Sequence, residues 1–87
     1  MTLTDTQAAI LTRMAGGATL THSLLGELWS LLEDPFTVFD DVSPRVLLRA
    51  GLIALAQRGS VKADRADAYR LTAAGHTALR AWRLSRL

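Results

Sequence analysis

The sequence predicts a small α+β domain in which helices and β-hairpins share one core. Three observations lead to this prediction. An amphipathic segment with a capping motif covers about residues 5–16. A short helix at 43–50 ends on Gly51 and turns directly into a strand. A strand–turn–strand pattern then leads into a last helix that runs to about Arg86. At 87 residues, the chain has the size of a single domain.

The composition is that of an ordinary globular protein, with 49% hydrophobic and 21% charged residues. The chain has no cysteine, which excludes disulfides, thiolate metal ligands and cysteine nucleophiles. No apolar run approaches the length of a membrane span, and no basic-then-apolar signal segment opens the sequence. We therefore expect a soluble, cytoplasmic protein without a membrane partner.

Basic side chains concentrate towards the C-terminus. The net charge of +2 is by itself a weak indication of a nucleic-acid partner. However, eight of the ten Lys and Arg residues lie at or after Arg49, and most of the acidic residues lie before residue 42. The C-terminal half is therefore the basic half.

The first helix is predicted by its cap and its apolar spacing. Residues 4–7 have the form of a capping box, in which Thr4 and Gln7 each satisfy a free backbone N–H group. Apolar side chains at positions 10, 11 and 14 then share one helical face, and the glycines at 16 and 17 end the helix.

Residues 18–33 fit two structures. Leucines at 20, 24, 28, 31 and 32 match a helical face, with Thr21 as a candidate cap. Alternation along the same stretch also matches two short strands joined across residues 25–27. Glycine inside a helix costs about 1 kcal/mol relative to alanine but suits a tight turn, so Gly26 favours the hairpin. The helix remains the open alternative.

The predicted helix at 43–50 organises the chain. Ser43 is in position to cap it, and Pro44 suits the first helical position, where an N–H group would have no partner. Its two faces differ in chemistry, with Val46, Leu47 and Ala50 on one side and Arg45 and Arg49 on the other. A helix with this pattern, followed by a sharp stop, suits recognition of an anionic surface.

Strands and a final helix are predicted after this helix. Residues 52–55 continue as a strand, residues 57–60 signal a turn, and a second strand follows a polar stretch. Thr72 caps the last helix, whose core face contains Gly75, Ala78, Leu79 and Trp82. Gly75 would let this helix approach the first one closely. Because a small domain needs its large side chains for burial, four aromatic residues are expected in the core: Trp29, Phe36, Phe39 and Trp82.

Two strings resemble those of winged-helix domains. Arg-Ala-Gly-Leu-Ile at 49–53 is similar to the segment after the recognition helix in many bacterial and phage winged-helix regulators, and residues 69–79 resemble the string that closes the wing and opens the final helix. The resemblance covers nearly the whole chain. It implies double-stranded DNA binding and transcription regulation, with helix 43–50 in the major groove and hairpin 58–67 as the wing. The DNA-binding residues that it implies are Ser43, Arg45, Arg49, Arg58, Lys62 and Arg65.

Two features depart from the family pattern and keep a second function open. Residues 18–33 stand where the family has a separate helix, and Asp40 and Asp41 lie where phosphates would approach. Asp64 and Asp67 can also neutralise the wing by pairing with its basic residues. The alternative function is a winged-helix protein-interaction module or a phage-type inhibitor that binds a protein partner.

The last helix offers a candidate homodimer contact. Winged-helix regulators often pair through a terminal helix, and a two-fold dimer would match a palindromic site. The residues expected in this contact are Arg80, Arg83, Leu84 and Leu87.

No residue pattern indicates catalysis. The sequence contains no recognisable acid/base pair, phosphate loop or nucleophile motif. His22 and His76 have no second histidine or carboxylate at ligand spacing, so neither is expected to bind a metal. We therefore expect no enzymatic activity, cofactor or metal.

Overall fold

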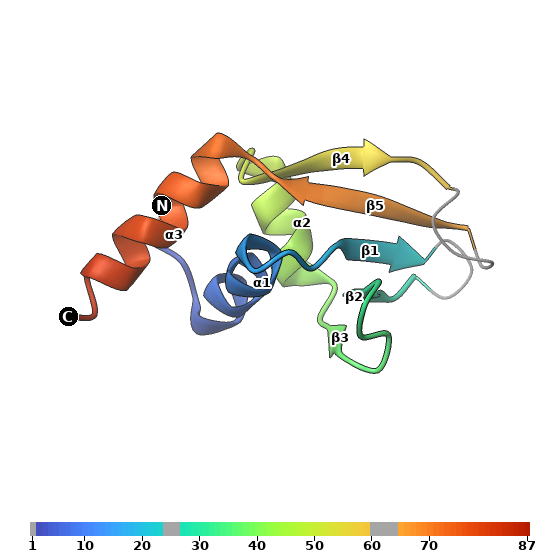
Figure 1. Cartoon of the computed structure of the whole chain (residues 1–87), viewed down its shortest axis with the longest axis horizontal. Coiled ribbons are helices and arrows are strands. Elements are labelled where there is room, and N and C mark those ends of the chain that lie inside the picture. The colour runs from blue at the N-terminus through green and yellow to red at the C-terminus, as the bar shows by residue number, and fades with distance from the viewer. Residues whose placement is uncertain (1, 24–26, 60–64) are drawn as a thin grey trace.

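The computed structural model describes residues 2–23, 27–59 and 65–87. Over these ranges the chain is a small α+β domain with helices on one side of an antiparallel sheet (Figure 1). The helices are α1 (Asp5–Ala15), α2 (Val42–Arg49) and α3 (Ala73–Leu84), and the strands are β1 (Leu20–Ser23), β2 (Trp29–Leu31), β3 (Val38–Phe39), β4 (Ile53–Gln57) and β5 (Ala66–Leu71).

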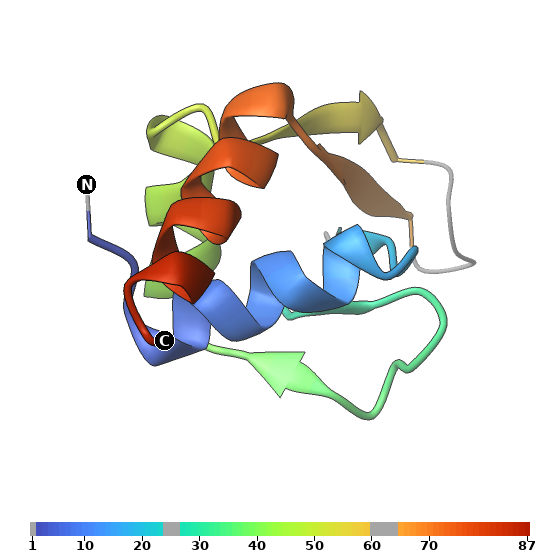
Figure 2. The same cartoon turned by 60° about the vertical axis from the view of Figure 1, so that its left-hand side comes forward.

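The sheet has the strand order β3-β2-β1-β5-β4, and all neighbouring strands are antiparallel. In Figure 1 the helices gather at one end, and the β4–β5 hairpin extends towards the other, with β5 leading back into α3. The molecule is accordingly elongated, with extents of 41 × 22 × 21 Å. Turning the view shows α3 crossing in front of α2 and α1 (Figure 2). Among the described helices, none combines the length and apolarity that crossing a bilayer requires.

The capping box predicted for the first helix is confirmed. Gln7 N donates to Thr4 Oγ1 over 3.1 Å, and Thr4 N donates to Gln7 Oε1 over 3.0 Å. These reciprocal bonds satisfy two backbone donors that a helix start otherwise leaves free. The apolar face at positions 10, 11 and 14 is buried against the sheet, as its spacing predicts.

The middle segment is a hairpin, as the glycine preference indicated. Leu20 pairs with Leu31 and His22 pairs with Trp29 across β1 and β2. The pairing is stable in this register because one face buries the two leucines, while Thr21 Oγ1 bonds to Ser30 on the other. The turn predicted at Gly26 lies outside the described residues. A further strand, β3, extends the sheet beyond β2 and was not predicted.

The placement of Phe36 in the core is wrong. Its side chain is 95% exposed, whereas Phe39 on β3 packs partly against the core. The cause is the turn at residues 34–37, in which Thr37 N donates to Asp34 O and Thr37 Oγ1 donates to Asp34 Oδ2. A closed turn of this kind leaves its central side chains in solvent.

The cap of α2 also differs from the prediction. The helix begins at Val42, and Asp40 rather than Ser43 satisfies its first turn, because Asp40 Oδ2 accepts bonds from Ser43 N at 2.9 Å and Ser43 Oγ at 3.1 Å. The buried face differs from the predicted one as well. It comprises Ser43, Pro44 and Leu47, while Val46 is half-buried and Ala50 is exposed.

The glycine stop after α2 is confirmed. Gly51 has φ +76°, and the N–H groups of Gly51 and Leu52 donate to Leu48 O and Leu47 O. This is the bonding of a Schellman motif, which explains why the chain leaves the helix directly into β4. The cap of α3 is confirmed as well, since Gly75 N donates to Thr72 Oγ1 over 3.1 Å.

Gly75 permits a close approach, but not to the predicted neighbour. A Cβ atom at this position would lie 2.1 Å from Leu52 O and 2.5 Å from Leu71 Cδ1. The glycine therefore faces the turn between α2 and β4 rather than α1. Further along α3, Leu79 is buried, and Ala78 and Trp82 pack partly against the core, as predicted.

Candidate nucleic-acid interface

One face of α2 is exposed and carries alternating charge. Asp41, Arg45 and Arg49 follow one another at intervals of four residues, so their side chains lie along one side of the helix. Arg45 Nε donates to Asp41 Oδ1 over 2.9 Å, whereas Arg49 makes no ion pair with a described carboxylate. Ser43 does not belong to this face, because it is buried and bonded to Asp40.

Trp29 lies directly beneath the start of α2. Its Nε1 donates to Asp41 Oδ1 over 3.0 Å, and the Arg45 guanidinium carbon lies 5.9 Å from the centroid of its ring. His22 stacks on the same indole with ring centroids 4.2 Å apart. The strand β2 therefore fixes both charged side chains of the first turn of α2.

Tyr69 on β5 is a second aromatic neighbour of Trp29, with ring centroids 5.3 Å apart. Burial raises the pKa of the Tyr69 hydroxyl and the Asp67 carboxylate raises it further, while Arg45 and Arg58 act in the opposite direction. Arg45 belongs to α2 and Arg58 follows β4, so two separate basic elements act on a single phenol. Sequence reasoning treated Tyr69 only as a strand residue, because nothing local signals this convergence.

The β4–β5 hairpin keeps its arginines available. Asp67 Oδ1 accepts the N–H of Gly59 over 2.7 Å, so this carboxylate closes the hairpin. Arg58 and Arg65 are exposed and make no ion pair with any carboxylate in residues 2–23, 27–59 and 65–87. Lys62 and Asp64 lie outside the described residues.

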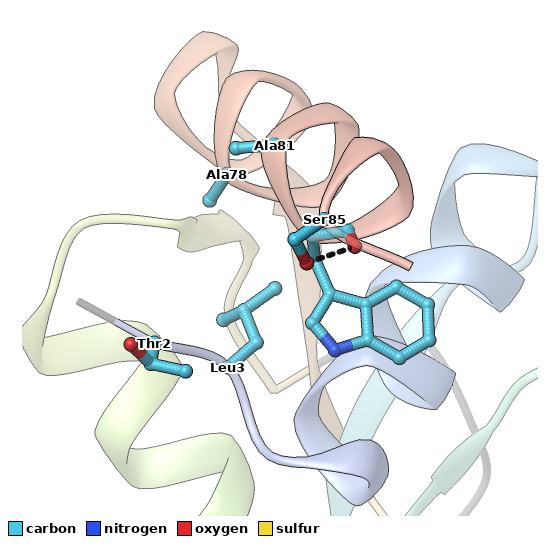
Figure 3. Close-up of a pocket in the computed structure, with 6 residues that line it drawn as sticks. Thr2, Leu3, Ala78, Ala81 and Ser85 are labelled. Carbon is cyan, nitrogen blue, oxygen red and sulfur yellow. Dashed lines mark hydrogen bonds between the residues drawn. The ribbon is translucent and has the colours of Figure 1, made fainter. Parts of the chain in front are cut away.

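The candidate dimer residues lie on another surface. Arg80, Arg83, Leu84 and Leu87 are all exposed at the C-terminal end of the chain, away from the β4–β5 hairpin (Figure 1). Beside them, a hollow of about 240 Å³ separates α3 from the N-terminal segment and is lined by Thr2, Leu3, Ala78, Ala81, Trp82 and Ser85 (Figure 3). The homodimer contact stays a prediction.

Metal ligation has no visible basis in the part of the chain that the structure describes. No group of three or more histidines or carboxylates there is arranged to hold an ion. His22 Nε2 is buried without a hydrogen-bond partner among the described residues, and its ring stacks on Trp29. This histidine is therefore a packing residue of the sheet face.

Acid should weaken the attachment of α2. The Ser43 backbone N–H is the main cause that lowers the pKa of Asp40, and the Trp29 indole N–H, followed by Arg45, lowers the pKa of Asp41. Because folding lowers these pKa values, the stabilisation is complete above the unfolded-state value and disappears as the pH falls through the folded-state values. We expect the urea midpoint to fall below about pH 4. The Asp41→Asn variant should lose less stability than the wild type over this pH range. Identical pH profiles of the urea midpoint for the two proteins would contradict the role of Asp41 in acid destabilisation.

Comparison with known proteins identifies no relative: no family model, curated protein or solved structure matches this chain.

Proposed function

We propose that this chain is a winged-helix-like domain that binds double-stranded DNA and regulates transcription in the cytoplasm. The order of the elements supports this proposal. A helix, α2, is followed by the β4–β5 hairpin and then by α3, while β1 pairs with β5 on the side opposite β4. In a winged helix the corresponding helix enters the major groove and the hairpin contacts the backbone.

The observation that carries the proposal is that α2 and the β4–β5 hairpin both expose basic side chains, with Arg45 on the helix and Arg58 on the hairpin. A DNA surface needs cations from the helix and from the hairpin on one side of the protein, so that one duplex can contact both. Arg49 and Arg65 add exposed charge to the same two elements. An α-helix such as α2 is about 10–12 Å in diameter with its side chains, which fits a major groove about 12 Å wide.

Salt dependence tests this function. Anisotropy of a labelled duplex should give an observed binding constant that falls with salt, with a log–log slope of about −0.9 per phosphate contacted. Arg58→Ala should flatten the slope by about one contact. Arg49→Ala should cost about 1–3 kcal/mol on a preferred sequence and little on others.

Arg86→Ala is the matched control for these variants, because Arg86 is exposed and is not among the candidate dimer residues. It removes the same charge just after α3, at the end of the molecule away from the hairpin (Figure 1). Its slope should equal that of the wild type. If no duplex is bound in a salt-dependent manner at low ionic strength, the proposed function is wrong.

A protein partner is the second candidate function, and exposed apolar side chains favour it. Phe36 precedes the edge strand β3, Val38 lies on that strand, and Val42 begins α2. All three are exposed. An edge strand offers unpaired backbone groups to which another chain can add. A failure of the duplex experiment would leave this candidate in place.

A further inference from the structure

The side chain of Arg45 is held by a fixed partner. Asp41 Oδ1 accepts hydrogen bonds from Trp29 Nε1 at 3.0 Å and from Arg45 Nε at 2.9 Å. Trp29 is itself 1% exposed, and its ring contacts those of His22 and Tyr69. The indole cannot move without disturbing the core. Its hydrogen bond therefore holds the Asp41 carboxylate in a defined position, and the bond from Asp41 holds the Arg45 side chain in turn.

Arg45 and Asp41 each have hydrogen-bonding groups that their mutual contact does not use. The bond to Asp41 uses Arg45 Nε–H, and both terminal Nη groups are without a partner among the described residues. Asp41 Oδ2 is likewise unengaged in that part of the chain. The two side chains are 48% and 60% exposed, so a ligand can reach both. A forked donor therefore stands next to a single acceptor.

We infer that Asp41 is a positioning residue that makes Arg45 a reader of guanine and adds recognition of a neighbouring amino-bearing base. The inference rests on the proposed DNA-binding function. The two Nη groups match the O6 and N7 acceptors of guanine, and a carboxylate oxygen accepts from the amino group of cytosine or adenine in the major groove. The preferred duplex carries a guanine with cytosine or adenine beside it.

The carboxylate also disfavours the less specific alternative. Asp41 repels a phosphate placed next to Arg45 more than it repels a neutral base edge, because the phosphate and the carboxylate carry like charges. Holding the guanidinium in place reduces the side-chain entropy that is lost on binding. The acid therefore acts as part of the recognition surface, although it lies where phosphates would approach.

The experiment uses the full chain and a duplex selected by the wild type from a randomised pool. The dissociation constant is measured for this duplex and for the same duplex with the contacted guanine replaced by 7-deazaguanine. The replacement should weaken wild-type binding by about 10- to 100-fold. The same replacement should weaken binding by the Arg45→Ala and Asp41→Asn variants only a few-fold. Non-specific DNA binding by Asp41→Asn should be as tight as that of the wild type or tighter.

Asp40→Asn is the matched control, because it removes the same charge one residue away and Asp40 contacts Ser43 instead of Arg45. The 7-deazaguanine replacement should weaken binding by this variant as much as it weakens binding by the wild type. The indole N–H signal of Trp29 in NMR spectra verifies that each variant is folded.

Three outcomes would overturn the inference. An Asp41→Asn variant that discriminates as well as the wild type means that Asp41 does not position Arg45, while the proposed function stands. A preferred duplex that contains no guanine would also contradict the inference and leave the proposed function intact. Absence of salt-dependent binding to any duplex overturns both the inference and the proposed function.

Discussion

Replacing Trp29 with alanine should lower the free energy of unfolding by about 3–5 kcal/mol. Trp29 is among the largest fully buried side chains, and its ring contacts His22 on β1 and Tyr69 on β5. Its removal opens a cavity and also frees Asp41 from its indole partner. The loss would be a large fraction of the stability of a domain of this size, which is typically about 5–15 kcal/mol. Urea unfolding followed by circular dichroism measures it.

Two other variants separate the causes of this loss. Trp29→Phe keeps an aromatic ring but removes the indole N–H, so it should retain most of the stability and raise the pKa of Asp41 towards its ordinary value. Trp82→Ala makes the same substitution in a half-buried ring on α3, so its cost should be smaller than that of Trp29→Ala. An unchanged melting temperature for Trp29→Ala would contradict the burial of this ring.

Features with a local cause could be predicted from the sequence. The capping box of Thr4 and Gln7 and the glycine stop at Gly51 depend on backbone bonds within a few residues, and both are present. The hairpin at β1 and β2 followed from alternation together with a glycine. These signals act over short distances, so neighbouring residues suffice to specify them.

Features that depend on distant contacts could not be predicted. Phe36 is predicted to be a core residue because its side chain is large and apolar, but a turn closed by Asp34 and Thr37 leaves it exposed. From the sequence, the acidic residues before α2 are expected to disfavour the approach of phosphates. The hydrogen bond between Asp41 and an indole twelve residues away cannot be predicted from local sequence. Likewise, the contact of Trp29 with Tyr69 requires a sheet register that no local pattern specifies. The candidate site is built largely from such contacts.

Gly75→Ala should destabilise the domain by about 3 kcal/mol, the upper end of the usual range for overpacking. In an ordinary helix the same change stabilises by up to about 1 kcal/mol, so the sign of the effect is diagnostic. The alanine Cβ would lie 2.1 Å from the carbonyl oxygen of Leu52, which is a backbone atom and cannot rotate away. That oxygen also accepts the N–H of Thr72, and Thr72 Oγ1 donates to Gly51 O over 2.7 Å. Relieving the clash therefore requires α3 to separate from the turn that ends α2.

The matched control for this change is Gly16→Ala at the end of α1. Gly16 has a negative φ of −81°, and its added Cβ would have an ordinary contact of 3.4 Å with Arg13 O. Thermal unfolding should therefore give a melting temperature near that of the wild type for Gly16→Ala and a clearly lower one for Gly75→Ala. Because α3 docks on the turn between α2 and β4, the Gly75 variant should also broaden NMR signals of residues 47–53. Equal stability of the two variants would mean that α3 does not pack this closely on Leu52.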